Sequence, residues 1–169
     1  MASAKERLLQ WLRDAHAMEE QAEQMLSSQA KRLENYPQLR ERIEHHLQET
    51  RRQAERVRGC IERHGSSKSA IKDMTGKVVA VGQGLSGLFV GDEVVKGSLA
   101  DYTFEHMEIA SYKILIGAAD EAGDPETKRV CQEILREEEA MASWLDQHLP
   151  ALTKEYLKRE QTPGVTAKH

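Results

Sequence analysis

Aromatic residues, prolines and cysteines are all scarce in this sequence. Aromatic residues make up 5% of the 169 residues, and there are 4 Pro and 2 Cys. The low aromatic content disfavours a β-rich fold, because strands are enriched in aromatic and β-branched residues. Cys60 and Cys131 have no further Cys or His at zinc-finger spacing, and a disulfide framework needs more cysteines than these. The sequence therefore excludes a disulfide-stapled domain and fits a reducing, cytoplasmic location.

The sequence also lacks a large excess of charge of one sign and a long apolar run. The 24 Lys and Arg residues oppose 28 Asp and Glu residues, for a net charge of −4. The basic cluster between Arg51 and Arg63 is interleaved with glutamates, which is typical of a solvated helix face, so we expect no binding to nucleic acid. The longest uncharged stretch, residues 78–91, is shorter than the roughly 20 residues that span a bilayer. With no signal-peptide run at the N-terminus, we expect a soluble protein that binds no membrane.

Apolar residues at helical spacing are what the sequence does contain. In residues 3–33 they recur every three or four positions, with one gap at position 19, and predict a first amphipathic helix. Pro37 suits the first turn of a second helix, and Gly65 suits its C-terminal end. The short linker between the two helices makes them antiparallel neighbours.

Helical periodicity resumes in the last third of the chain. A third helix is predicted from Leu99 or Asp101 to Ala119, and a fourth begins at Asp124-Pro125 and ends at Pro150. A short helix over residues 152–160 and a flexible tail over 161–169 complete the predicted elements.

A long connection, residues 66–97, separates the two pairs of helices and holds six of the 11 glycines. About 30 residues can carry the chain back along a whole bundle, so the second and third helices are predicted to run parallel. The expected fold class is all-α: a ferritin-like four-helix bundle with a long crossover between helices two and three and a short C-terminal helix. We expect one domain over residues 1–160.

A glycine motif within this connection resembles a dinucleotide-binding fingerprint. Residues 82–87 match G-x-G-x-x-G and follow a strand-like stretch, residues 77–81. That fingerprint needs parallel strands in βαβ units, and the rest of the chain is predicted to be helical. We therefore interpret the glycines as small residues that allow close helix packing.

Acidic residues and one histidine interrupt the apolar face of each predicted helix near its middle. The candidates are Glu19, His46, Glu49, Glu105, Glu108, Glu137 and Glu138. One glutamate at the edge of an apolar face usually reaches water. Several ionised carboxylates in one core repel each other, and each costs several kcal/mol to desolvate. Two divalent cations would nearly neutralise them, and a Glu from each of four helices is typical of a dinuclear iron or manganese site.

Four segments that carry these residues resemble the YciE/YciF family of bacterial ferritin-like stress proteins. They are residues 14–21, 46–50, 104–112 and 137–139. The YciE branch is the nearer resemblance, because residues 35–37, 82–83 and 92–97 are also similar. The resemblance implies a helical bundle, usually dimeric, with a dimetal centre. Its implied ligands are Glu19, His46, Glu49, Glu105, Glu108, and Glu138 or Glu137.

The spacing of these ligands departs from the ferritin pattern. Ferritins typically use Glu-x-x-His, whereas here His46 precedes Glu49 and Arg52 occupies the expected histidine position. A ferroxidase assignment therefore does not follow. A carboxylate-rich site favours Fe or Mn, with Zn also able to bind in a purified sample. We expect Glu49 and Glu138 to bridge the metals, with Glu19 and Glu108 as terminal ligands and His46 and Glu105 completing the coordination.

Two functions are compatible with the sequence. The first is a dimetal-binding protein of bacterial stress response that reacts with a small oxidant such as O2 or peroxide; whether it is an enzyme stays open. The alternative is a non-catalytic structural or interaction protein whose core carboxylates hold no functional metal centre. We expect a homodimer in either case.

Overall fold

The computed structural model describes residues 2–65 and 94–167, and within these residues it is all-helical, with no strand. The helices are α1 (Ala4–Ala30), α2 (Pro37–Arg63), α5 (Val94–Glu121) and α6 (Pro125–Glu160). The predicted all-α fold class is confirmed. The glycine motif at residues 82–87 and the strand-like stretch before it lie outside the described residues.

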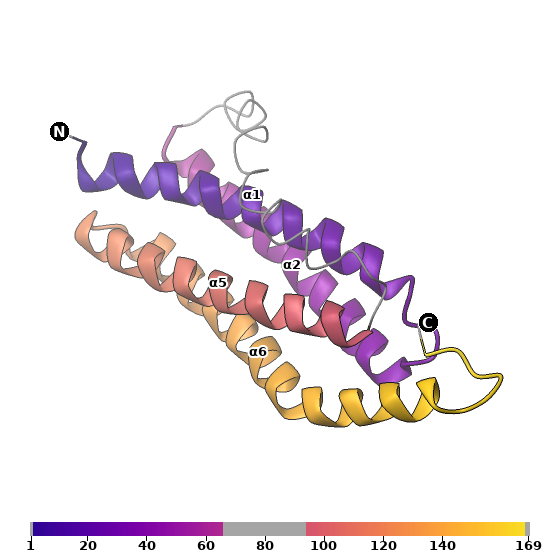
Figure 1. Cartoon of the computed structure of the whole chain (residues 1–169). Helices are drawn as coiled ribbons and strands as arrows, with labels where there is room; N and C mark the ends of the chain where they lie inside the picture. The colour runs from indigo at the N-terminus through magenta and orange to yellow at the C-terminus, as the bar shows by residue number, and fades with distance from the viewer. Residues whose placement is uncertain (1, 66–93, 168–169) are drawn as a thin grey trace.

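The four helices form two antiparallel hairpins (Figure 1). In one hairpin α1 packs along α2, and in the other α5 packs along α6. The hairpins meet where α1 contacts α5 and α2 contacts α6. Helices α2 and α5 run in the same direction, as the long connection between them predicts (Figure 1). All four helices therefore turn one face toward a common core.

Local signals in the sequence explain where three of the helices begin or end. The Ser3 side chain accepts a hydrogen bond from the Glu6 backbone N–H, and the Glu6 carboxylate accepts one from Ser3 N, which makes a capping box for α1. The Asp124 carboxylate caps α6 through Thr127 N at 3.0 Å. Gly65, just after α2, has φ +79°, a left-handed conformation that glycine adopts without strain.

Two predicted helix boundaries are wrong. Helix α5 begins at Val94 rather than Leu99 or Asp101, because Val94 and Ser98 are buried in its first turns. Helix α6 does not end at Pro150 and the separate short helix does not exist: one helix runs from Pro125 to Glu160. It changes direction in its second half (Figure 1), since a proline inside a helix removes a hydrogen bond and bends it.

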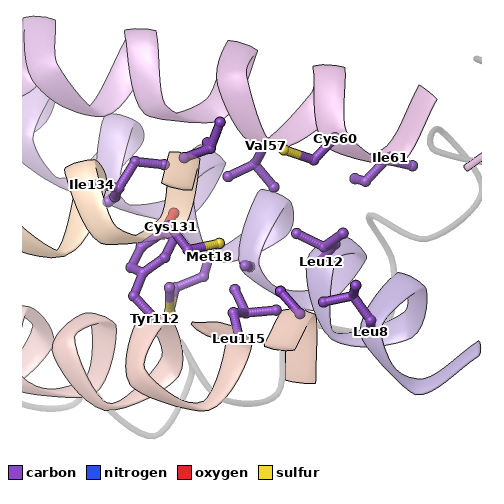
Figure 2. Close-up of a cluster of buried hydrophobic side chains, with 14 of the residues drawn as sticks. Leu8, Leu12, Met18, Val57, Cys60, Ile61, Tyr112, Leu115, Cys131 and Ile134 are labelled. Carbon is purple, nitrogen blue, oxygen red and sulfur yellow. The ribbon is translucent and has the colours of Figure 1, made fainter. Parts of the chain in front are cut away.

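The apolar core consists of two clusters, one toward each end of the bundle. The first includes Leu12, Cys60, Leu115, Cys131 and Ile134 (Figure 2). The second includes residues of α1 and α2 with Leu145, Leu152 and Tyr156 of α6. Contacts of Leu152 and Tyr156 with this second cluster favour continuation of α6 beyond its proline. No helix in the described part of the chain holds a stretch apolar and long enough to cross a bilayer.

The described part of the C-terminal tail, predicted to be flexible, makes specific contacts. The Tyr36 hydroxyl donates a hydrogen bond to the Ala167 carbonyl at 2.8 Å, and the side chain of Tyr36 is buried. Arg159 donates to the Thr166 carbonyl at 3.0 Å. The first contact joins the tail to the start of α2, and the second joins it to the end of α6.

We expect Tyr36→Phe to lower the free energy of unfolding by about 1 kcal/mol, because it removes one buried hydrogen bond. Urea unfolding measures this change. Tyr102→Phe is the matched control, since the Tyr102 hydroxyl donates to Asp146 at the surface and its loss should cost less than about 0.5 kcal/mol. Equal effects of the two substitutions would show that the tail contact contributes nothing to stability.

Candidate metal centre

Buried polar side chains from all four helices lie between the two apolar clusters. Most are less than 2% exposed, although side chains of these types seldom lose contact with water completely. The buried polar residues near the helix middles are Glu19, His46, Thr50, Gln53, Asp101, Glu105, Glu108 and Glu138. The core thus has a polar layer flanked by apolar ones, and this layer holds most of the residues that the sequence singled out.

Four of these residues form a compact cluster: His46 of α2, Glu105 and Glu108 of α5, and Glu138 of α6. Each offers a ligand atom, and these atoms lie within 4.8 Å of one another. His46 Nε2 is 3.2 Å from Glu105 Oε1 and 3.3 Å from Glu138 Oε2. Three helices therefore bring one imidazole and three carboxylates to a single point.

Several carboxylate oxygens in this layer are buried without a hydrogen-bond partner. They are Glu19 Oε2, Glu105 Oε2, Glu108 Oε1, and both oxygens of Glu138. Because a buried polar atom without a partner costs free energy, native proteins pair nearly all such atoms. Five buried oxygens without a hydrogen bond at one place, one of them 3.3 Å from His46 Nε2, fit a site that takes up positive charge.

The pKa shifts in the cluster also indicate a site that favours positive charge. Burial raises the pKa of Glu138 to about 7, and burial together with the nearby Glu138 raises the pKa of Glu19 and of Glu108 well above 4.5. Burial opposes ionisation of His46, but Glu105 and the other carboxylates around it raise its pKa well above 6.5. The site therefore favours added positive charge, which a proton or a metal ion can supply.

Glu19 lies beside the cluster and pairs with a tyrosine. The Tyr112 hydroxyl donates a hydrogen bond to Glu19 Oε1, and both residues are fully buried. Burial and the neighbouring Glu19 raise the pKa of Tyr112 well above 10. Helical spacing places Tyr112 one turn after Glu108 on the inner face of α5, but its hydroxyl contact to Glu19 depends on how α1 and α5 meet.

Glu49 lies behind His46 rather than among the four cluster residues. Glu49 Oε2 is 2.9 Å from His46 Nδ1, while the other ring nitrogen faces the cluster. Arg42 and His45 approach the same oxygen at 3.5 and 3.4 Å. A carboxylate on the outer nitrogen of a histidine fixes the orientation of the ring and directs its other nitrogen to a ligand.

The structure distinguishes Glu138 from Glu137. Glu138 is fully buried in the cluster, whereas Glu137 is partly exposed and accepts a hydrogen bond from Gln53 Nε2 at 2.8 Å. Arg56 lies 3.9 Å from the other oxygen of Glu137. Of the two helix-four candidates, only Glu138 joins the cluster.

The donor set fits a divalent metal ion. It offers one imidazole nitrogen and oxygens of Glu105, Glu108 and Glu138, with Glu19 adjacent. Carboxylate oxygens with imidazole suit Mn and Fe, while thiolates, which Zn and Cu(I) often take, are absent from this group. Cys60 and Cys131 lie in the first apolar cluster instead.

One buried acid escaped the sequence analysis. Asp101 is fully buried on α5, one helical turn before Glu105. The signal was its four-residue spacing from Glu105, which places both on the inner face of a helix. Asp101 is not among the predicted ligands because the sequence allows the helix to begin at this position, where an aspartate usually faces water.

Solved structures of other proteins share this fold. A protein from Xanthomonas campestris pv. campestris is 39% identical, with 95% of this chain and 100% of that chain covered and a TM-score of 0.78. The stress protein YciF of E. coli is 22% identical, with 92% of this chain and 99% of that chain covered and a TM-score of 0.72. YcfI of Rhodopseudomonas palustris, provisionally described as a structural protein, is 26% identical. The match covers 86% of this chain and 94% of that chain, with a TM-score of 0.68.

The family assignment rests on nearly the whole chain. Residues 3–158 match the profile of a family described as a domain of unknown function, DUF892. Together with the likeness to YciF and YcfI, this match confirms the predicted YciE/YciF-type resemblance. The nearer resemblance to YciE stays a prediction. The chain belongs to the DUF892 family and has a YciF-like helical bundle.

Proposed function

We propose that this protein binds two divalent metal ions, Fe or Mn, in its core and acts in a bacterial stress response. The observation that carries the metal proposal is the cluster of His46, Glu105, Glu108 and Glu138, with its unpaired buried oxygens. Two divalent ions carry four positive charges, which balance these three carboxylates and Glu19. The stress role is carried over from E. coli YciF, which is described as a stress protein.

His46 Nε2 and the carboxylates of Glu105, Glu108 and Glu138 are the proposed ligands, with Glu19 as a further one. Glu49 was expected to bridge the metals; its contact with His46 Nδ1 instead supports a positioning role. Glu137 is left out because it faces Gln53 and Arg56.

A redox function is the finer part of the proposal. Two bound metal ions can share the electrons that a small oxidant such as O2 or peroxide takes up. The chain's own residues would hold the ions, and the apolar clusters on either side would exclude water from them. Tyr112 would keep Glu19 in place through its hydroxyl.

Elemental analysis of the purified protein tests metal binding. We expect about two Fe or Mn ions per chain after anaerobic reconstitution, as in carboxylate-bridged dinuclear bundles. A double variant, Glu19→Ala with Glu138→Ala, should retain almost none. No bound Fe, Mn or Zn in the wild-type protein under these conditions would overturn the proposal.

Stopped-flow oxidation of Fe2+ tests the redox part separately. We expect O2 or H2O2 to oxidise Fe2+ faster with the wild-type protein than with the double variant. Equal rates in a protein that does bind metal would remove the redox function and leave the binding function.

Glu49→Gln should weaken metal binding roughly 10- to 100-fold without reducing the number of ions bound at saturation, as expected for a residue that orients a ligand. Titration with Mn2+ monitored by electron paramagnetic resonance measures both quantities. His45→Gln is the control, because His45 approaches the same carboxylate but is largely exposed. Loss of one whole equivalent of Mn2+ would instead identify Glu49 as a direct ligand, as the sequence predicted.

A structural or interaction role is the second candidate. A groove of about 380 Å³ between α1 and α5 is lined mainly by apolar residues, among them Trp11, Met18, Met107 and Ile114. Trp11 is 39% and Ile114 56% exposed, so two large apolar side chains border this groove at the surface. The provisional description of YcfI as structural also favours this role. We propose a homodimer, and sedimentation of the wild-type protein and of Ile114→Lys tests whether this face is involved.

A further inference from the structure

A second polar site lies next to the cluster, formed by Asp101 of α5 and Gln29 of α1. Asp101 is fully buried, and neither of its carboxylate oxygens has a hydrogen-bond partner. Gln29 is 8% exposed, and its amide oxygen and nitrogen are likewise buried without partners. Apart from the interaction of these two side chains with each other, the four polar atoms lack hydrogen-bond partners, which is costly in a protein core.

The lack of a side chain at Gly97 leaves room for the Gln29 amide beside α5. A Cβ atom at Gly97 would lie 2.9 Å from Gln29 Nε2, so the absence of a side chain there is what admits the amide. Gly97 is one turn before Asp101 on the same helix. Gln29 lies near enough to Asp101 to act on its carboxyl: burial raises the Asp101 pKa to about 7, and the Gln29 amide lowers it in part. The two side chains are thus directed to the same place.

This site continues the line of carboxylates that forms the metal centre. Asp101, Glu105 and Glu108 follow each other at four and three residues on the inner face of α5. At 1.5 Å per residue, each step along the helix is about 5–6 Å. The charge on His46, a member of the cluster, acts on Asp101 as well. Gln29 is 8% exposed, whereas Asp101 is fully buried.

We propose that Asp101 and Gln29 form a transient binding site for an incoming divalent metal ion, from which the ion passes to Glu105 and the centre. The inference rests on the proposed metal function. One carboxylate and one amide oxygen, completed by water, are hard ligands of the kind that Mn2+ and Fe2+ accept. Too few protein ligands are present for tight binding, and this suits a site that must release its ion.

The test measures the rate at which metal-free protein takes up Mn2+, separately from the number of Mn2+ ions finally bound. Metal-free protein is mixed with Mn2+ in a stopped-flow instrument, and a fluorescent indicator reports free Mn2+. We expect Asp101→Asn to slow loading about tenfold, the lower end of what a focused charge contributes to an association rate. The number of ions held after desalting should stay at the wild-type value, because the centre is unchanged.

Two further variants make the experiment decisive. Asp120→Asn is the matched control: it is the same substitution on the same helix, at an exposed residue paired with Lys128, and it should load at the wild-type rate. Gln29→Leu keeps Asp101 but removes the amide, and it should slow loading to a smaller degree. It also separates the loss of a ligand from the loss of charge.

The outcomes separate this inference from the proposed function. If the wild-type protein binds Mn2+ and Asp101→Asn loads as fast as it does, the loading site is overturned and the centre stands. The same holds if Asp120→Asn slows loading equally, since the effect would then be one of net charge. If the wild-type protein holds no metal, the proposed function fails, and the loading site fails with it.

Discussion

We expect Glu138→Gln to abolish the proposed metal binding and at the same time to stabilise the metal-free protein. Glutamine keeps the shape of the side chain but cannot supply the negative charge that a metal ligand needs, so bound metal should fall below roughly one tenth of the wild-type content. Without metal, Glu138 is a fully buried acid beside Glu105, and its main polar contact is His46 Nε2, 3.3 Å from Oε2. Because the pKa of Glu138 is raised from 4.5 to about 7, its ionised form costs the fold about 3 kcal/mol at pH 8, and a neutral glutamine of similar volume relieves this cost.

Elemental analysis and urea unfolding at pH 8 measure the two effects on the same sample. Glu139→Gln is the control: it is the next residue along α6, it is about half exposed, and it pairs with Lys113 at the surface. It should change the metal content little and the stability by less than about 0.5 kcal/mol. If Glu138→Gln instead lowers the stability of metal-free protein, the acid has a structural role and the proposal of a site built for cations is wrong.

The stability of the metal-free protein should fall as the pH rises from about 4.5 to about 7. Burial raises the pKa of Glu138 to about 7 from 4.5, so the folded protein holds a proton that the unfolded chain releases. A raised pKa of an acid means stability that is full below about pH 4.5 and is lost progressively up to about pH 7. For Glu138 alone the loss amounts to about 3 kcal/mol. Glu19 and Glu108 shift in the same direction.

Urea unfolding between pH 4.5 and 7.5 measures this dependence. Glu138→Gln should flatten the profile, and saturating Mn2+ should reverse the loss at neutral pH, because metal displaces protons from the ligands. Glu49 opposes this fall in stability with pH. Partial burial raises its pKa, but contact with His46 lowers it, and the net shift is downward. Because Glu49 is closer to solvent than Glu138, its effect should be the smaller one. A profile that rises with pH in the metal-free protein would contradict the electrostatics of the cluster.

The fold was largely predictable because its determinants are local. The apolar spacing in α1 and α2, Pro37 with Gly65, and the cap at Asp124 define the hairpins. The continuation of α6 past Pro150 was not predictable from local rules. It depends on Leu152 and Tyr156 packing against residues of α1 and α2, which are distant in the sequence. The start of α5 was missed for the same reason: burial of Val94 outweighs the weak helix propensity of Gly97.

The site was predictable to the level of helix faces but not of side-chain directions. Spacing placed Glu105 and Glu108 inward and selected the correct region of α6, yet it could not decide between Glu137 and Glu138. That choice depends on how α6 is turned about its own axis, which brings Glu137 to Gln53 and Arg56 of α2 and Glu138 into the cluster. The position of Glu49 behind His46 depends on a side-chain rotamer, which sequence spacing does not specify.

The division of the proposed ligands between the two hairpins has a consequence for folding. His46 belongs to the α1–α2 hairpin, while Glu105, Glu108 and Glu138 belong to the α5–α6 hairpin. Neither hairpin alone holds the full set, so a chain emerging from the ribosome cannot complete the site until its second half has docked on the first. Only the fully assembled bundle would then bind the proposed metal ions, and an incomplete chain would take up no iron or manganese at this site.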